Sequence, residues 1–392
     1  MSDRPDPAGG PRTVQELQVV GPGRLAWVPR RTPALADGAF RLDSVVAGVS
    51  AGTELTFVKG TNPGVRRTFD AELGLFGPVD GTDPHARPDP HLDPPDGDAG
   101  PYPVGHLGYM QVGRVTVTRS PQVGVGDLVA ATYGQSSGHD LDPLRERFVV
   151  LPPGTDPLLG IYVAHMGPIC ANGLLHAAAD LLGPPVPDLG GGVRGRRVLV
   201  TGAGVVGLVT ALFADHLGAA EVVVADPTPT RREVAAGLGL ATVDPGSVDL
   251  GEWAARRWRH GAADRGADVV FQCRGRTSSL QDALRALRPQ GTVVDLAMYP
   301  GGAPEVRLGE EFHHNGLRIV CAQIGRVPRG TAHLWDRERL SAATVELLAA
   351  RGAAVLGHLV TDVVPAADAP ELYADLAAGR RRTLQAVLRW PT

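Results

Sequence analysis

Cysteine and lysine are scarce in this chain of 392 residues, and each scarcity excludes a class of site. Only three cysteines occur, Cys170, Cys273 and Cys321, and they are widely spaced, each within or beside an apolar run. This pattern excludes a disulfide framework and a cysteine-rich zinc knuckle, and it predicts buried, reduced thiols. Lys59 is the only lysine, so a Tyr-x-x-x-Lys catalytic dyad is impossible.

Long apolar runs and blocks of one charge are also missing. No apolar run approaches the roughly 18 residues that a membrane span needs, so we expect no transmembrane helix. The formal charge is -4, and arginines are mixed with acidic residues, which argues against nucleic acid and membrane surfaces as partners. Residues 1–12 are polar and rich in Pro and Gly, which predicts a disordered N-terminus rather than a signal peptide, and hence a cytoplasmic protein.

The first part of the chain indicates a β-rich domain. From about residue 13 to 150, short β-branched segments such as RLDSVVAGVS and GRVTVTRS are broken by Gly and Pro. Inside this region, residues 77–103 are packed with Pro, Asp, Gly and His and cannot bury a core, so we expect a long surface loop or lid. Its histidines, His85 and His91, are read as solvated loop residues rather than as metal ligands.

The second part alternates between strands and helices. From residue 196, β-branched segments such as RRVLVTGAG, AEVVVADP and GADVVFQC alternate with amphipathic segments such as SSLQDALRALRPQG. Uninterrupted apolar strands between amphipathic helices predict a parallel sheet covered by helices on both faces. The last 65 or so residues predict helix, strand, helix and strand in that order. The fold class is therefore α/β, with a β-rich companion domain.

The strongest chemical signal is a glycine motif between a predicted strand and a predicted helix. In VLVTGAGVVG, Gly202 permits the tight turn, Gly204 lets a pyrophosphate approach the backbone, and Gly207 lets the helix pack on the strand. Asp226 ends the next strand, where its carboxylate can bind both ribose hydroxyls and would repel a 2'-phosphate. We therefore expect NAD, with NADP less favoured, although Arg231 and Arg232 follow closely.

The predicted cofactor-binding residues share a place in or near this strand-to-helix region. They are Gly202, Gly204, Val205, Val206, Gly207, Asp226, Arg231, Cys273 and Asn172.

Over nearly its whole length the chain resembles the medium-chain dehydrogenase/reductase superfamily, in the alcohol and polyol dehydrogenase group. The pieces that carry the resemblance are SAGTE, GYMQVGRV, GDLVAATY, TGAGVVG and LRPQGTVVDLAMY. The resemblance implies a GroES-like catalytic domain over 13–167 and 327–392 and a Rossmann NAD-binding domain over 168–326. It also implies an active site in the cleft between domains and a homodimer or homotetramer, with the strand GLRIVCAQI as a candidate for pairing across a two-fold axis.

The residues that hold catalytic zinc in such relatives are replaced here. The family turn Cys-Gly-Thr/Ser-Asp is Ala51, Gly52, Thr53 and Glu54 in this chain, the ligand of Gly-His-Glu aligns with Tyr109, and the third ligand aligns best with Pro168. Zinc would polarise the carbinol oxygen, and these side chains are poor or impossible ligands. We expect no zinc at this site, although Cys170 and His165 lie close enough in sequence to be ligands if the alignment shifts.

Another group must then hold the substrate oxygen and move its proton. Thr53 matches the family's proton-relay hydroxyl, and Tyr109 stands where a ligand would point into the cleft. Glu54 and His165 are candidates for orienting groups. The alternatives are structural: Thr53 as the cap of a turn, Tyr109 as an apolar filler, and His165 as a buried, hydrogen-bonded histidine.

The function implied is a zinc-independent, NAD-linked oxidoreductase. It would exchange hydride between nicotinamide and a secondary alcohol or ketone of a small polar or specialised metabolite, such as a polyol, cyclitol, sugar or intermediate of secondary metabolism. One alternative is an NADPH-type quinone or enoyl reductase, since those branches also lack zinc, and Asp226 argues against it. Another is a dinucleotide-binding protein without turnover.

Overall fold

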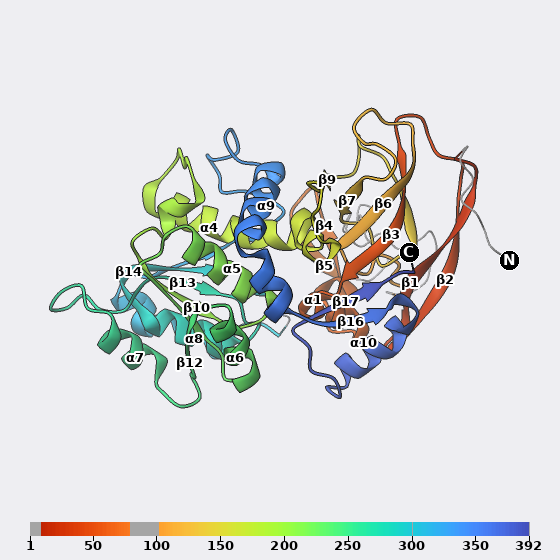
Figure 1. The fold of residues 1–392 in the computed structure, drawn as a ribbon. Coiled ribbons are helices and arrows are strands. Elements are labelled where there is room, and N and C mark those ends of the chain that lie inside the picture. The colour runs from red at the N-terminus through yellow and green to blue at the C-terminus, as the bar shows by residue number, and fades with distance from the viewer. Residues whose placement is uncertain (1–8, 79–101, 300, 392) are drawn as a thin grey trace. The chain divides into compact units, whose positions relative to one another are not determined.

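The computed structural model describes residues 9–78, 102–299 and 301–391. The chain divides into two compact units (Figure 1). Unit 1 runs to His165 and resumes at Val360, and unit 2 runs from Met166 to Leu359. This confirms the α/β class with a β-rich companion domain.

Unit 1 is built on a seven-stranded sheet whose strands are mostly antiparallel. The order is β16 (Val360–Pro365), β17 (Gln385–Arg389), β3 (Phe40–Gly48), β6 (Gln111–Thr118), β7 (Leu128–Ala131) and β9 (Phe148–Val150), with β8 (Gly138–Leu141) paired to β3. Two further hairpins are β1 (Arg12–Gly21) with β2 (Arg24–Thr32), and β4 (Arg67–Asp70) with β5 (Leu75–Pro78). The chain thus returns from unit 2 to add β16 and β17 beside β3.

Two helices of unit 1 lie against one another in its core. The stretch SAGTELTFV, read above as a turn, forms the helix α1 (Ala51–Val58), which packs on α10 (Ala369–Ala377). Phe57 and Val58 of α1 and Tyr373 of α10 belong to one buried apolar cluster. The carboxyl-terminal end of α1 is therefore packed into the core of unit 1.

Unit 2 is a doubly wound fold. Its six strands are all parallel, in the order β12 (Ala241–Val243), β11 (Glu221–Ala225), β10 (Arg197–Thr201), β13 (Ala267–Gln272), β14 (Leu287–Asp295) and β15 (Arg318–Cys321). The helices are α4 (Gly167–Leu182), α5 (Val205–His216), α6 (Pro229–Gly237), α7 (Leu250–Arg257), α8 (Thr277–Ala286) and α9 (Arg337–Ala354). The order reverses between β10 and β13, which is where such folds bind dinucleotides.

Short helices complete the described chain. They are α2 (Pro63–Arg66), α3 (Pro157–Gly160), the π-helices Tyr162–Met166, Leu308–Phe312 and Val355–Leu359, and the 3-10 helices Leu189–Gly192 and Ala366–Asp368.

The N-terminal end of the fold differs from the expectation. Strand β1 begins at Arg12, inside the terminus predicted to be disordered, because the Arg12 guanidinium binds Asp43 at 2.5 Å and Asp140 at 3.1 Å. Most of the predicted surface loop, including His85 and His91, lies outside the described residues.

The second boundary between the units also differs. Unit 2 extends to Leu359 rather than to 326, because α9 packs on α4 and α5 of the same unit. The final helix-strand-helix-strand segment is therefore shared: its first helix belongs to unit 2 and the rest to unit 1.

Two apolar helical stretches bear on the expectation that no helix spans a membrane, and they are weak evidence against it. Within the described residues, two helical stretches, Pro157–Leu182 and Arg337–Leu359, are long and apolar enough for a membrane span by length and composition. In the first, 78% of the most apolar window is buried, as in the core helix of a globular protein; in the second, 39% is buried.

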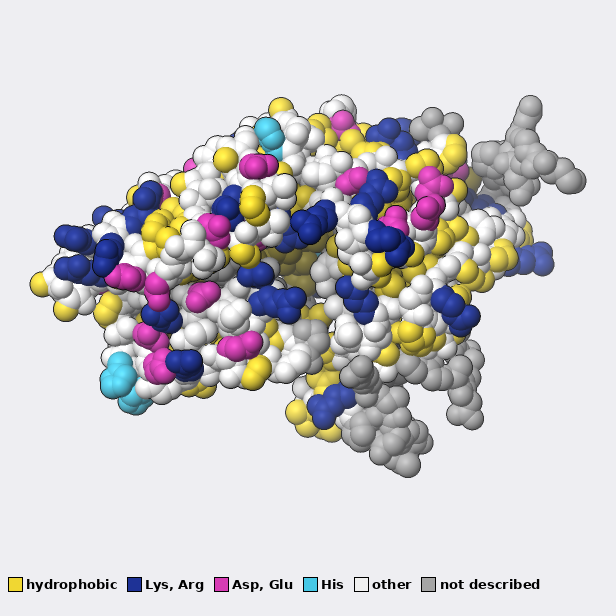
Figure 2. Space-filling view, turned by 90° about the horizontal axis from the view of Figure 1, so that it is seen from below, with side chains coloured by type: hydrophobic (Ala, Val, Ile, Leu, Met, Phe, Trp, Pro, Cys, Tyr) yellow, Lys and Arg dark blue, Asp and Glu magenta, His cyan; other side chains and the backbone are white. Residues whose placement is uncertain are grey.

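On the face drawn in Figure 2, basic and acidic side chains are interspersed, which agrees with the mixed charge of the sequence.

Candidate active site and cofactor-binding loop

The glycine loop of unit 2 has the geometry that a pyrophosphate site requires. Gly202 follows β10 with φ +100°, a conformation that favours glycine. A Cβ on Gly207 would collide with the carbonyl oxygen of Gly202, whereas a Cβ on Gly204 would meet only the Arg231 guanidinium, at 4.0 Å. Gly204 thus leaves open space at the start of α5, whose first residues, Val205 and Val206, carry N–H groups without intrahelical acceptors. The residues present fit a dinucleotide.

Asp226 lies buried directly after β11 and is 1% exposed. Its carboxylate accepts hydrogen bonds from the backbone N–H groups of Ala203 at 2.9 Å and Thr228 at 2.8 Å. A carboxylate has about four lone-pair positions, so acceptor capacity remains for ribose hydroxyls. The Arg231 guanidinium lies 4.0 Å from the same carboxylate, so both an acid and a cation border this place.

Two other predicted cofactor-binding residues make contacts with the protein itself. Cys273 packs beside Gly207, and burial raises the pKa of its thiol well above the usual value, so the thiol is neutral. Asn172, on α4, is fully buried, and its amide nitrogen donates to backbone carbonyls that follow β15. Their contact with cofactor stays a prediction.

In unit 1, the fold places two of the predicted catalytic residues, Thr53 and His165, beside the phenol of a third, Tyr109. The Tyr109 hydroxyl lies 3.4 Å from Thr53 Oγ1, and the Tyr109 and His165 rings lie 4.6 Å apart between centroids. Thr53 comes from the first turn of α1, Tyr109 precedes β6, and His165 lies in the π-helix Tyr162–Met166. Such one-turn π segments occur often at functional sites. All three side chains are partly exposed.

A third hydroxyl joins this group, and the sequence reasoning missed it. Ser50 Oγ lies 2.5 Å from Tyr109 Oη. Ser50 is the N-cap residue of α1, yet its side chain makes no capping hydrogen bond. The available signal was a serine directly before the helix, next to the altered metal turn. We call Ser50, Thr53 and Tyr109 the hydroxyl cluster.

Glu54 is placed behind the hydroxyl cluster rather than in it. Its carboxylate accepts a hydrogen bond from the backbone N–H of Ser50 at 2.6 Å and another from the Tyr373 hydroxyl. Burial raises the pKa of Glu54 from 4.5 to about 7, and these hydrogen bonds lower it by less. Tyr373 also contacts Gln135, whose amide lies 3.4 Å from the Tyr373 oxygen. Tyr373 and Gln135 were not foreseen from sequence, because they are brought in by α10 and the loop after β7.

The donor set does not fit a four-coordinate zinc site. Among the described residues, no three His, Cys, Asp or Glu side chains form a group that could hold a metal ion. Ala51 and Pro168 offer no side-chain donor, and the Tyr109 hydroxyl is bonded to Ser50. The alternative ligand Cys170 is buried, and its thiol lies 3.4 Å from the Val206 carbonyl oxygen.

Comparison with known proteins agrees with this architecture. A family model described as zinc-binding dehydrogenase matches residues 205–336. D-guloside 3-dehydrogenase of Escherichia coli K12 is 28% identical over 364 residues, which cover 92% of this chain and 95% of that protein.

Two solved structures share the fold of the whole chain. One, from Sinorhizobium meliloti and described as a zinc-binding dehydrogenase bound to NADP, has a TM-score of 0.69 and 17% identity over 96% of this chain and 99% of that one. The other, an alcohol dehydrogenase of Escherichia coli CFT073 with NADH, has a TM-score of 0.65 and 15% identity over 96% and 99%. The chain is therefore similar over nearly its whole length to medium-chain zinc-type dehydrogenases, matches the zinc-binding dehydrogenase model over residues 205–336, and is an oxidoreductase with a dinucleotide-binding fold.

Proposed function

We propose that this protein is a zinc-independent, NAD-linked dehydrogenase that interconverts a secondary alcohol and a ketone on a small, polyhydroxylated metabolite. The observation that carries the proposal is the hydroxyl cluster of Ser50, Thr53 and Tyr109. Thr53 and Tyr109 align with the metal turn and the second ligand of the family that the sequence resembles. The glycine loop and Asp226 support the nucleotide part of the proposal.

When bound, the nicotinamide supplies the chemistry of hydride transfer. The protein residues must hold the substrate oxygen and take its proton. Tyr109 is the group proposed to bind that oxygen, because the residue is partly exposed and its hydroxyl is hydrogen-bonded to Ser50. During oxidation, Tyr109 accepts the alcohol proton as its own proton passes to Thr53, which is partly exposed and hands it to solvent. Reduction of the ketone runs the same transfers backwards.

His165 and Glu54 are proposed to orient this group. The His165 ring lies against the Tyr109 ring and limits its rotation. Glu54 holds the backbone of Ser50 and so fixes the Ser50 hydroxyl relative to Tyr109. Neither residue needs to contact the substrate.

A sugar-like substrate is supported by the relative named D-guloside 3-dehydrogenase, whose similarity covers 92% of this chain. NAD is favoured over NADP because the buried Asp226 carboxylate would face a 2'-phosphate. Arg231 could offset that repulsion in part, so we expect a preference rather than exclusion.

A substrate panel tests the proposal. The panel holds sugar glycosides, sugar alcohols, cyclitols, simple secondary alcohols and conjugated enones, each assayed with NAD or NADP and their reduced forms. We expect oxidation of a polyhydroxylated substrate, with kcat/KM for NAD at least about tenfold above that for NADP, a difference of about 1.4 kcal/mol. Reduction of enones with NADPH, without oxidation of any alcohol, would instead identify an enoyl reductase.

We also propose that the protein is a cytoplasmic homodimer paired along β15. This strand ends the sheet of unit 2, and Arg318, Ile319 and Cys321 are exposed along it. An exposed edge with apolar residues favours pairing with a second copy. Sedimentation should give about twice the 41.0 kDa chain mass, and a monomer at micromolar concentration would contradict the proposal.

A further inference from the structure

Helix α4 carries a polar stripe that the mechanism above does not use. Asn172, His176 and Asp180 recur every four residues on a helix that is otherwise mostly apolar. Residues four apart lie on one face of a helix, so the three side chains are directed to the same side. Polar groups in a buried helix require partners, and the partners show what the stripe does.

The first residue of the stripe binds the loop that leaves β15. Asn172 Nδ2 lies 3.4 Å from the carbonyl oxygen of Ala322, 3.2 Å from that of Gln323 and 3.2 Å from that of Arg326. One side chain of α4 thus contacts three backbone carbonyl groups within residues 322–326.

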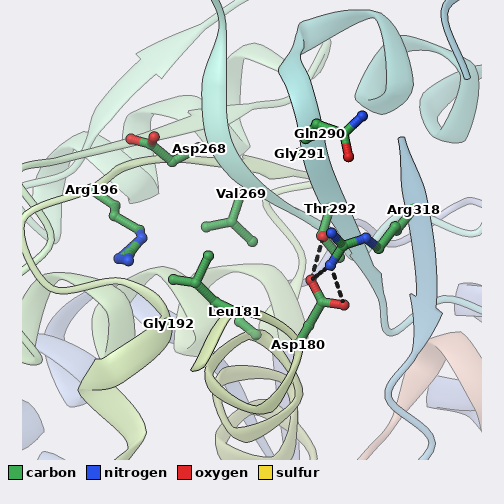
Figure 3. Close-up of a pocket in the computed structure, with 11 residues that line it drawn as sticks. Asp180, Leu181, Gly192, Arg196, Asp268, Val269, Gln290, Gly291, Thr292 and Arg318 are labelled. Atoms are coloured by element: carbon green, nitrogen blue, oxygen red, sulfur yellow. Dashed lines mark hydrogen bonds and ion pairs between the residues drawn. The ribbon is translucent and has the colours of Figure 1, made fainter. Parts of the chain in front are cut away.

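The last residue of the stripe fixes the other end of α4. Asp180 accepts a hydrogen bond from Thr292 Oγ1 of β14 at 2.6 Å and pairs with Arg318 of β15 at 3.1 Å (Figure 3). These contacts line a cavity at the amino ends of the strands. The 322–326 loop lies at the opposite, carboxyl end, so α4 is fixed to β15 and its loop at both ends.

The position of the loop indicates what this arrangement serves. In a doubly wound sheet, ligands bind outside the carboxyl ends of the strands, and each half of the sheet takes one mononucleotide. The half β10–β12 holds the glycine loop and Asp226, which suits the adenosine end. The half β13–β15 is left for the nicotinamide end. Asn172 and its neighbour Gly173 border that half, since a Cβ on Gly173 would lie 3.0 Å from Leu296, just after β14.

We propose that Asn172 is a positioning residue for the nicotinamide end of the dinucleotide, acting through its three hydrogen bonds to the backbone of residues 322–326. Asparagine suits this role because its amide nitrogen carries two hydrogens and no charge. Its Oδ1 atom is buried without a partner among the described residues, so the nitrogen is the atom in use. The inference rests on the dinucleotide fold and not on the proposed alcohol chemistry.

The test compares two ligands that share the adenosine end. Dissociation constants for NADH and for ADP-ribose, which lacks nicotinamide, are measured by calorimetry on the wild type and on Asn172→Ala and Asn172→Ser. We expect Asn172→Ala to weaken NADH binding about tenfold or more and ADP-ribose binding less than about twofold, with Asn172→Ser in between. Ser341→Ala is the matched control, because it removes another buried polar atom of unit 2 that has no described partner, and should change neither constant.

Three outcomes would overturn the inference. If the affinities for NADH and ADP-ribose fall equally, Asn172 has a general structural role. If the NADH affinity is unchanged, Asn172 has no role in positioning the nicotinamide end. If neither variant folds, Asn172 is needed for folding alone. Selective loss of NADH binding in a protein that oxidises no alcohol would leave the inference standing and refute the proposed function instead.

Discussion

At the scale of single residues, Ser50 departs from the local rule for its position. An N-cap serine usually bonds to its own helix and contributes about 0.5–2 kcal/mol to stability. Here the hydroxyl is bonded to Tyr109, and the Glu54 carboxylate accepts the backbone N–H of Ser50 instead. A residue that forgoes a local stabilising contact for a distant one is a candidate for function.

The first prediction concerns the phenol of the hydroxyl cluster. Replacing Tyr109 by phenylalanine keeps the ring beside His165 but removes the group that binds and protonates the substrate oxygen. We expect kcat to fall by about 10²–10⁴, with the melting temperature nearly unchanged. Tyr102→Phe is the matched control, because it removes a hydroxyl that bonds only to the Phe57 carbonyl in the described contacts. Equal losses in both variants would show that the effect is not specific to the site.

The second prediction concerns pH and Glu54. The pKa is raised from 4.5 to about 7 by burial, so the folded state holds the proton more tightly than the unfolded state. The contribution of Glu54 to the free energy of unfolding is therefore complete below about pH 4.5 and is lost as pH rises towards 7. The loss is on the order of 3 kcal/mol.

Denaturant titrations between pH 4.5 and 8 check this sign. Glu54→Gln, which cannot ionise, should gain stability relative to the wild type as pH rises through this window. Glu233→Gln, an exposed carboxyl on α6, should show no such trend. A difference that grows in the opposite direction would mean that Glu54 is ionised and stabilised in the fold.

At the scale of elements, the glycines between β10 and α5 have two roles: Gly204 leaves space for a ligand, and Gly207 lets α5 pack closely on the preceding turn. The sequence was sufficient here, because the strand, the three glycines and Asp226 follow each other in the order that the fold requires. Asn172 was harder to place, because its partners lie about 150 residues later in the chain and no local pattern links them. Hydrophobic periodicity predicts which side of a helix or strand is buried, but it does not predict which distant loop that side contacts.

The third prediction contrasts Gly204→Ala with Gly207→Ala. A methyl group on Gly207 would strike the Gly202 carbonyl, so α5 must shift and the melting temperature should fall by several degrees. A methyl group on Gly204 meets only the far end of Arg231, so folding should be unchanged while NADH affinity drops at least about tenfold. Thermal melts and NADH fluorescence titrations measure both. Undiminished NADH binding by Gly204→Ala would exclude the pyrophosphate from this loop.

At the scale of the whole molecule, the two-unit plan followed from alternation in one part and short strands in the other. The position of the second boundary, expected near residue 326 and found at Leu359, could not be read from the sequence. The sequence of α9 does not show which unit it joins, and only its packing on α4 and α5 assigns it to unit 2. The hydroxyl cluster was predicted in part for a related reason. Thr53 and Tyr109 stand at motif positions, whereas Gln135 and Tyr373 are joined only by the fold.

We propose that the hydroxyl cluster does the work that zinc does in the family that the sequence resembles. The most direct test is the zinc content, by elemental mass spectrometry, of catalytically active, untagged protein prepared without chelators. We expect less than about a tenth of an equivalent per chain, with activity that survives dialysis against a chelator, because no three His, Cys, Asp or Glu side chains of the described residues form a group that could hold a metal ion. One equivalent retained on dialysis, with activity lost when it is stripped, would contradict the account and return attention to Cys170 and His165 as ligands.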